Sequence, residues 1–395
     1  MRGIKVGSAF GIPIQLNWTF LLVLPLFVAL IGWDITQLAG VLNNTIDAGI
    51  DTAALAGGWR PWVLGTIVTV GLFTGVLLHE FGHSLVALRY GYQIDSISLW
   101  LLGGMASFVE VPENWRHEFW VAVAGPLVSV GVGAVCYAGF LILPETFHPG
   151  RFVLGYLAVI NVVLAVFNML PAFPMDGGRV LRALLARTRP HARATQLASE
   201  VGKVAAFLLG IVGLFTNWFL ILLALFIYVA ASGEAQQTAM KAALEGVTVA
   251  DIMTPRADLH TVSETTTVQE LMQRMFRERH TGYPVMDADQ LVGLITLEDA
   301  REVREVERDA YQVSEVMATN VITVGPKTDA MEAMDTMQSE DVGRLPVVTS
   351  GGVVVGLVTR TDFMTAFNIA ESSGNTVTFR TDDPGGTDRN PTRPQ

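Results

Sequence analysis

The distribution of apolar residues divides the chain into two parts. Up to about residue 233, apolar residues form long stretches in which charged residues are rare. A helix needs about 20 predominantly apolar residues to cross a bilayer. The pattern therefore predicts six membrane spans, at residues 14–33, 62–87, 119–143, 152–170, 201–215 and 218–231. Residues 34–61 are expected to form a loop between the first two spans.

A short stretch between the second and third spans has a different pattern. Residues 94–108 partly alternate between apolar and polar positions around the pair Gly103-Gly104, and they are too few to span as a helix. This pattern predicts two short strands joined by a Gly-Gly turn. Apolar non-helical backbone near a membrane is tolerated only when it is buried in protein or lines a cavity. The alternative is a surface hairpin between two spans.

The second part of the chain contains an internal repeat. The segment from Gly293 to Asp299 recurs 63 residues later, from Gly356 to Asp362, and two further segments recur with nearly the same offset. This period is too long for a solenoid unit and fits a duplicated β-α-β-β-α module. The expected organisation is a membrane domain at 1–233, a helical linker at 234–246, modules at 247–309 and 310–370, and a disordered tail at 371–395.

Composition and charge support this division. Hydrophobic residues make up 51% of the chain and charged residues 16%, whereas soluble domains carry about 25% charged residues. Residues 1–233 hold 12 basic and 11 acidic side chains, and the remainder holds 14 and 26. The second part is therefore acidic and unsuited to nucleic-acid phosphates. The single Cys136 excludes intramolecular disulfides and cysteine-based zinc cages.

The second span carries the clearest chemical motif, His79-Glu80-Phe81-Gly82-His83. Residues four apart share a helix face, so the two imidazoles can hold one Zn²⁺. The intervening Glu80 can serve as the base toward a water molecule that the metal activates. A buried histidine on its own is usually a satisfied core residue. Two histidines and a glutamate in an apolar helix fit a functional site better, since ionisable groups are costly in a membrane.

A third ligand is expected from the end of the fourth span. There, two prolines stop the helix, and Asp176-Gly177-Gly178 follows. By itself Asp176 would be a turn-forming residue at a membrane exit. Catalytic zinc commonly takes three protein ligands and leaves one position open, so beside the two histidines Asp176 is the candidate for the missing oxygen ligand. His117, Glu118 and Glu200 are less attractive because ordinary boundary residues flank them.

Basic residues predict the orientation of the spans. Five arginines lie between residues 179 and 193 without an acidic residue among them. Lys and Arg collect on the cytoplasmic side of membrane proteins. The prediction is a multi-pass cell-membrane protein whose N-terminus and repeated modules are cytoplasmic, with residues 34–61 outside. His79, His83 and Asp176 would then lie at the cytoplasmic ends of their helices.

The membrane half resembles the site-2 protease family of intramembrane zinc metalloproteases. The resemblance rests on His79 through His83 and on the stretch from Asn168 to Gly178, in that order on separate spans. It implies that His79, His83 and Asp176 ligate one Zn²⁺ per chain and that Glu80 is the general base. It also implies that Asn168 lies near the reacting carbonyl or the substrate backbone. Residues 94–108 resemble the family's β-hairpin, to whose edge an unwound transmembrane protein substrate would add as a strand.

The second half resembles a tandem pair of CBS domains. The matching strings end at Asp299 and Asp362, and the resemblance implies that Thr296, Asp299, Thr359 and Asp362 contact an adenine nucleotide such as ATP or AMP. The string Thr-x-x-Asp also serves simply as a helix N-cap, so nucleotide binding and mere capping both stay open. Such pairs often associate, which makes a homodimer through these domains an expectation. A further hypothesis is that a bound nucleotide biases gating of the membrane core.

Two other classes of function compete with a protease. In a transporter or channel regulated by the CBS pair, His79, Glu80 and Asp176 would lie along an ion pathway. Such a protein would show inverted repeats with paired broken helices, and the sequence shows none. In a catalytically dead scaffold, one or more of the expected catalytic positions would be lost, yet all four are intact.

Overall fold

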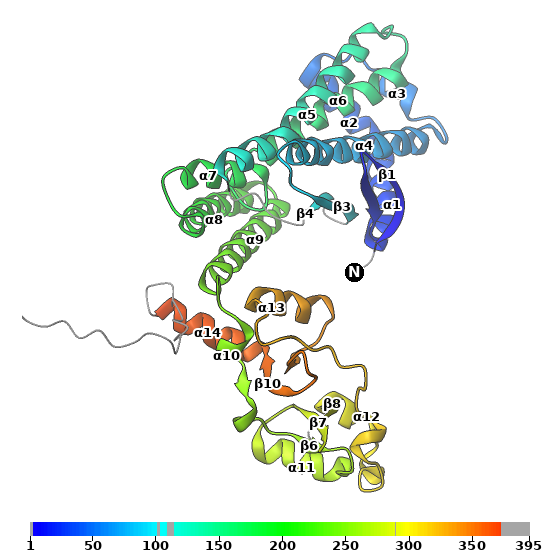
Figure 1. Ribbon diagram of the computed structural model, residues 1–395. Helices are drawn as coiled ribbons and strands as arrows, with labels where there is room; N and C mark the ends of the chain where they lie inside the picture. Colours follow the sequence, from blue (N-terminus) through cyan, green and yellow to red (C-terminus); the bar gives the residue numbers. More distant parts are fainter. Residues whose placement is uncertain (1–2, 101–102, 109–113, 289, 373–395) are drawn as a thin grey trace, which may run out of the picture. The chain divides into compact units, whose positions relative to one another are not determined.

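The computed structural model describes residues 3–100, 103–108, 114–288 and 290–372. The chain forms two compact units, Met1–Thr238 and Ala239–Gln395. The first unit consists mainly of long helices, and the second combines short helices with two small sheets (Figure 1). The predicted fold class is thereby confirmed. The predicted tail, residues 371–395, lies outside the described residues from position 373 onward.

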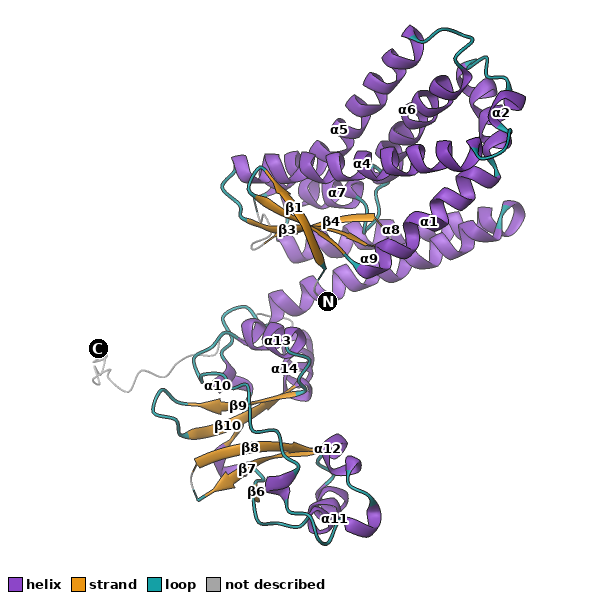
Figure 2. Cartoon of the chain, turned by 90° about the vertical axis from the view of Figure 1, so that its right-hand side faces the viewer, coloured by secondary structure: helices purple, strands orange, loops and turns teal. Residues whose placement is uncertain are grey.

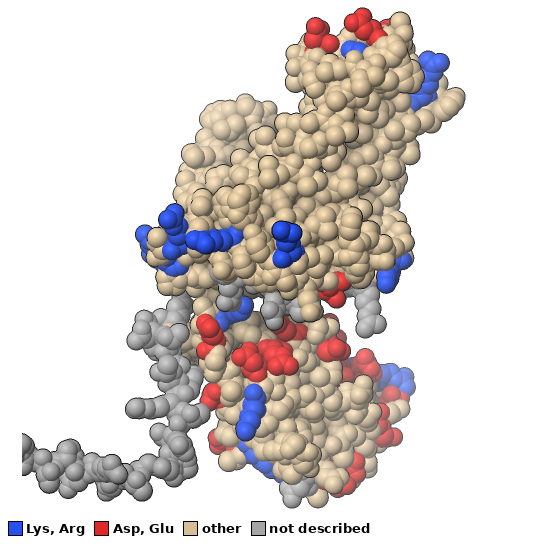
Figure 3. All heavy atoms as spheres, turned by 45° about the horizontal axis from the view of Figure 1, so that its top comes forward, with Lys and Arg blue, Asp and Glu red and all other residues tan. Residues whose placement is uncertain are grey.

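Five helices of the first unit are long and apolar enough to cross a membrane. They are α4 (Arg60–Arg89), α5 (Trp115–Ile142), α6 (His148–Asn168), α8 (His191–Thr216) and α9 (Trp218–Ala243). A sixth candidate is the bent pair of α1 (Trp18–Trp33) and α2 (Ile35–Ile46), which meet at 70°. On the face of this unit drawn in Figure 3, charged side chains gather at the two ends and are sparse between them. Such a belt suits a surface that faces lipid.

The segment between the first two predicted spans is not a simple loop, which corrects the expectation from the sequence. It contains α2 and the short helix α3 (Thr52–Leu55). Ile35, Ala39 and Leu42 lie on one face of α2 and are buried in a cluster with side chains of α5 and α6. Two acidic residues, Asp34 and Asp47, flank this helix. Helical apolar spacing therefore outweighs the acidic residues in this segment.

A four-stranded sheet packs beside α4. Its order is β1 (Ile4–Ala9), β2 (Ile12–Leu16), β3 (Ile94–Trp100) and β4 (Gly103–Phe108). β2 and β3 are parallel, and the other neighbours are antiparallel. The hairpin predicted over 94–108 is present as β3 and β4, but the sequence pattern missed the two preceding strands. Ile12 and Ile97 bury the sheet against Phe81 of α4, the helix that carries the zinc motif (Figure 2).

The basic segment after α6 is also helical. α7 (Asp176–Ala186) begins where the sequence predicted a turn. A Cβ atom on Gly177 would lie 2.3 Å from the carbonyl oxygens of Met169 and Leu170, so only glycine allows the backbones to approach this closely. The glycines that indicated a turn instead let α7 begin directly against the segment that ends α6.

The second unit contains the predicted duplication. The first copy comprises β6 (Val262–Ser263), α11 (Val268–Glu278), β7 (Gly282–Asp287), β8 (Gln290–Thr296) and α12 (Leu297–Glu302). The second copy comprises α13 (Ala330–Ser339), β9 (Arg344–Val348), β10 (Val354–Thr359) and α14 (Arg360–Ser372). Before the first copy lie α10 (Val249–Ile252) and β5 (Thr254–Pro255). β5 pairs with β10, so a segment that precedes one copy completes the sheet of the other.

Candidate metal centre

Two imidazoles and one carboxylate converge inside the first unit. His79 and His83 lie one turn apart on α4, and their ring centroids are 4.8 Å apart. Asp176 is the first residue of α7. Its Oδ2 lies 3.1 Å from Nε2 of His79 and 3.2 Å from Nε2 of His83. All three side chains are buried, and among the described residues they form a group that could hold a metal ion. The structure thus brings together the three ligands expected from the sequence.

Contacts on the far side of each ring orient the two histidines. Nδ1 of His83 lies 2.7 Å from the carbonyl oxygen of Val121, and Nδ1 of His79 lies 2.9 Å from Oγ of Ser129. A carbonyl oxygen can only accept, so the Nδ1 of His83 carries the proton and donates it. Metal-bound histidines almost always make such a hydrogen bond through the second nitrogen. The Nε2 atom of His83 is therefore left with a lone pair that faces His79 and Asp176.

The facing atoms suit zinc. With the same tautomer at His79, two imidazole lone pairs and a carboxylate meet with the Nε2 atoms 3.1 Å apart. Three acceptors at this distance repel one another unless a cation neutralises them. The ligand atoms of a tetrahedral zinc ion, each about 2.0–2.1 Å from the metal, lie about 3.3 Å apart. The donor set and its spacing therefore fit Zn²⁺.

A glycine on the neighbouring helix keeps the space beside the ligands free. A Cβ atom on Gly125 of α5 would lie 2.2 Å from Nε2 of His83 and 2.8 Å from Nε2 of His79. Gly125 therefore packs tightly against the two imidazole rings. Gly125 thus clears the position that a metal ion would take.

Glu80, the candidate general base, lies next to the sheet. Its side chain is half-buried, and a Cβ atom on Gly104 of β4 would lie 2.6 Å from its Cγ. The backbone of β4 therefore passes directly beside the carboxylate. In the order of the sheet β4 is a terminal strand. An edge of this kind is a template for pairing with another extended chain.

The other residues considered from the sequence make different contacts. Asn168 ends α6, and its Nδ2 donates to the carbonyl oxygen of Leu164, 3.0 Å away. His117 stacks on Tyr90 with ring centroids 4.1 Å apart. Glu118 is buried, yet it pairs with Arg182 of α7 and does not join the metal group. The interaction with Asn168 that the resemblance implies therefore stays a prediction.

The sequence reasoning missed a buried ionic network. Arg182 contacts Glu118 of α5 and Glu234 of α9, with N–O distances of 2.6 Å in both cases. Its guanidinium lies 5.1 Å from the ring centroid of Phe173. Buried charges are rarely found unpaired. The position of Glu118 near the start of an apolar helix could therefore have indicated that a basic side chain pairs with it.

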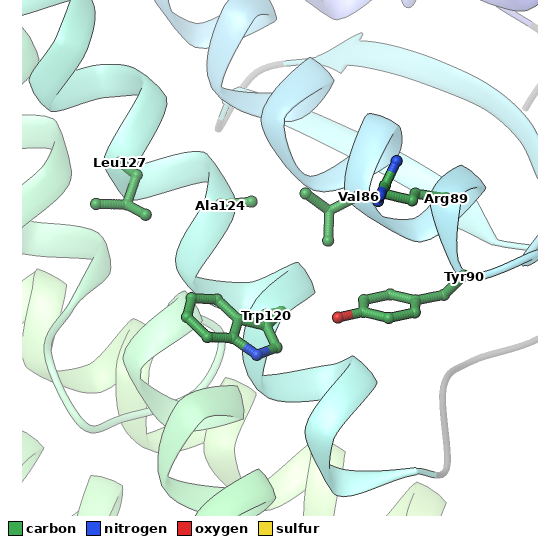
Figure 4. A pocket seen from close by; sticks show the side chains of 6 residues that line it. All are labelled: Val86, Arg89, Tyr90, Trp120, Ala124 and Leu127. Atoms are coloured by element: carbon green, nitrogen blue, oxygen red, sulfur yellow. The ribbon is translucent and has the colours of Figure 1, made fainter.

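A hollow of about 260 Å³ opens between α4 and α5. Figure 4 shows its lining from the two helices and from the residue that ends α4: Val86, Arg89, Tyr90, Trp120, Ala124 and Leu127. It has a cationic and aromatic rim beside apolar side chains. None of the predicted ligands lines it.

The residues of the predicted nucleotide site cap helices. Oγ1 of Thr296 donates to Oδ2 of Asp299 at 2.6 Å, and the backbone N–H of Thr296 donates to the same oxygen at 2.8 Å. Thr359 repeats both bonds to Asp362. This is the capping alternative left open by the sequence, and it satisfies backbone donors at the start of α12 and α14.

The sequence pattern did not indicate that Arg344 lies near the cap formed by Thr296 and Asp299. Nη2 of Arg344, on β9, donates to Oγ1 of Thr281 in the first copy at 2.9 Å. Burial lowers the pKa of Arg344, and the nearby Asp299 and Tyr283 counteract this by stabilising its positive charge. A partly buried guanidinium of the second copy therefore lies near Asp299 of the first.

Comparisons with known proteins agree with the geometry. The family described as peptidase family M50 matches residues 67–148 and 148–209, and the CBS domain matches 249–305 and 313–369. A zinc metalloprotease of Methanocaldococcus jannaschii is 32% identical over 93% of this chain and 97% of its own. Rip3 of Mycobacterium tuberculosis, which bears a provisional zinc metalloprotease name, is 31% identical over 96% of both chains. A solved site-2 protease from M. jannaschii is 33% identical, covering 59% of this chain and 95% of its own, with a TM-score of 0.41.

The membrane fold and the His-His-Asp group define the class, a membrane-embedded metalloprotease. The chain belongs to the site-2 protease family, peptidase family M50, and carries two C-terminal CBS domains. This assignment selects the protease over the transporter alternative.

Proposed function

We propose that this chain hydrolyses peptide bonds in or near transmembrane segments of membrane proteins, with one Zn²⁺ held by His79, His83 and Asp176. The observation that carries the proposal is the convergence of these three buried ligand atoms in the space that Gly125 leaves free. When bound there, a zinc ion supplies Lewis-acid polarisation of the scissile carbonyl and lowers the pKa of a bound water.

The remaining steps fall to side chains of the chain itself. Glu80, one residue from a ligand, takes a proton from the attacking water and returns it to the leaving amine. Asn168 carries an amide that can donate to the developing oxyanion. To do so, its Nδ2 would have to leave the carbonyl of Leu164, to which it now donates.

The terminal strand β4 supplies a place for the substrate. A transmembrane helix shields its own amides by hydrogen bonding, so it must unwind before it is cleaved. An unwound segment that pairs with β4 would gain main-chain hydrogen bonds. The close approach of Gly104 to Glu80 supports this arrangement, because it would place an added strand near the general base.

We also infer that the CBS pair binds an adenine nucleotide through Thr296, Asp299, Thr359 and Asp362, and that binding biases gating of the membrane unit. Arg344 supports this inference, since a cation beside Asp299 suits an anionic ligand. The cytoplasmic placement of the N-terminus and of the CBS pair, and a homodimer through these domains, belong to the same proposal.

The first test is cleavage of a single-span reporter in vesicles by the wild type and by Glu80→Gln, with zinc assayed in both. Loss of a general base typically costs about 10²- to 10⁴-fold in rate. We expect cleavage by the wild type alone and zinc in both proteins. Zinc without cleavage of any reporter would favour the scaffold alternative or another substrate. Absence of zinc from both purified proteins would contradict the ligand assignment.

A further inference from the structure

The helix that presents Asp176 is short and is held from one side by a single charged residue. α7 has 11 residues and is not among the candidate spans. Asp176 occupies its first turn, and Arg182 follows six residues later. Arg182 is 3% exposed. A cation buried to this extent must be compensated by its neighbours, so its partners decide where the helix can lie.

These partners come from three separate segments. Nε of Arg182 donates to Oε1 of Glu118 on α5, and Nη1 donates to Oε1 of Glu234 on α9, both at 2.6 Å. The guanidinium also lies over Phe173, in the segment between α6 and α7. We refer to Glu118, Arg182 and Glu234 as the α7 clasp. The planar guanidinium offers donors in fixed directions, so the clasp constrains both the position and the rotation of α7.

The clasp joins α7, which carries Asp176, to α5, the helix that orients the two histidines. α5 holds Glu118 and also carries Val121 and Ser129, which orient the two histidines. Phe173, under the guanidinium, lies three residues before Asp176 and is buried with Ala198 and Ala231. One side chain therefore fixes the helix of the carboxylate ligand to the helix that orients the imidazole ligands.

We propose that Arg182 is a positioning residue for the metal centre. It holds Asp176 against His79 and His83 through the α7 clasp, and it does not itself contact the metal or the substrate. This proposal rests on the proposed role of Asp176 as a ligand. A buried ion pair is weak evidence for a role in stability, because replacing such a pair with well-packed apolar side chains often leaves the free energy of unfolding unchanged or raises it. The distinctive effect of the clasp should therefore appear at the metal.

The experiment compares four variants of the full chain: Arg182→Met, Arg182→Lys, the double variant Glu118→Gln/Arg182→Met, and Arg189→Ala. The double variant removes both buried charges of the Glu118–Arg182 pair, so it avoids keeping the Glu118 carboxylate without the guanidinium that faces it. Arg189 is exposed and lies beyond the end of α7, which makes it the matched control. Zinc affinity is measured by competition with a chelator, reporter cleavage gives kcat and KM, and thermal melting reports folding.

Partners that orient metal ligands typically contribute about 10- to 100-fold in metal affinity or activity. We expect a loss of this size in zinc affinity and kcat for the double variant, with KM and melting temperature near those of the wild type. Arg182→Lys should recover part of the loss, and Arg189→Ala should match the wild type. A folded double variant with wild-type zinc affinity and kcat would overturn the proposal.

Asp176→Asn separates this proposal from the ligand assignment. If it binds zinc as tightly as the wild type, Asp176 is not a ligand and the proposed site is wrong. If it loses zinc while the double variant keeps it, the site stands and the positioning role of Arg182 is wrong.

Discussion

At the scale of single residues, the metal centre depends on an absent side chain as much as on the ligands. The three ligands converge, and they do so beside a position where a Cβ would lie 2.2 Å from Nε2 of His83, so Gly125 leaves both rings their space. Ser129 and the carbonyl of Val121 fix the ring orientations from behind. The ligands thus come from α4 and α7. Helix α5 supplies the hydrogen-bond partners of the two Nδ1 atoms and the glycine that leaves space beside the rings.

Gly125→Ala tests the role of this space. A methyl group 2.2 Å from Nε2 of His83 must displace the ring or occupy the metal position. We expect zinc affinity to fall by more than about tenfold, the lower end of effects seen when ligand geometry is disturbed. Chelator competition measures it. Gly131→Ala is the control, since no atom lies within 4 Å of a Cβ at that position of the same helix. Equal zinc affinity in all three proteins would contradict the assigned metal position.

The residues that the sequence could identify were those with a local signal. The four-residue spacing of His79 and His83 is enough to put them on one helix face, and the usual three protein ligands of catalytic zinc pointed to Asp176 at a membrane exit. Gly125, Ser129 and Arg182 have no such signal, because their roles arise only when α5, α4 and α7 pack together. Glu118 was considered and set aside as a ligand, and it became meaningful only with Arg182 beside it.

At the scale of elements, the four-stranded sheet packs against α4, the helix that carries the zinc motif. The strands β3 and β4 were predictable from alternation around Gly103-Gly104. The strands β1 and β2 were not, since so short a segment shows little periodicity and gains its structure by pairing with β3. Similarly, the helices α2 and α7 carry charged or glycine-rich ends that resemble loops when read alone. In each case tertiary packing outweighs the local pattern.

Gly104→Ala tests whether β4 and Glu80 act together. The added methyl would lie 2.6 Å from Cγ of Glu80 and must displace the general base. Misplacement of a catalytic group by about 1 Å can cost about 100-fold in rate. We expect kcat to fall by about 10- to 100-fold while zinc stays bound. The matched control is Gly7→Ala in β1, where a Cβ has no neighbour within 4 Å. Unchanged kcat in Gly104→Ala would contradict the proposal that β4 and Glu80 act together.

At the scale of the whole molecule, one helix belongs to both units. α9 begins at Trp218 in the membrane unit and ends at Ala243, beyond the boundary after Thr238. Near its middle, Ala231 is buried with Phe173, close to Asp176 in sequence. Near its end, Met240 is buried in the apolar core of the second CBS copy.

The covalent connection through α9 gives the gating hypothesis a test. A nucleotide can bias the membrane unit only if it favours one of two arrangements that differ at the protease. Allosteric couplings typically change an equilibrium by about 5- to 150-fold, so we expect saturating ATP or AMP to shift reporter cleavage by at least about fivefold. An insertion of four Gly-Ser residues after Thr238 should interrupt α9 and abolish this shift, while basal cleavage and nucleotide binding persist. Binding is measured by calorimetry on the full chain in detergent.

Equal cleavage with and without bound nucleotide in the uninterrupted chain would contradict the hypothesis. A shift that survives the insertion would leave regulation intact but exclude α9 as its route.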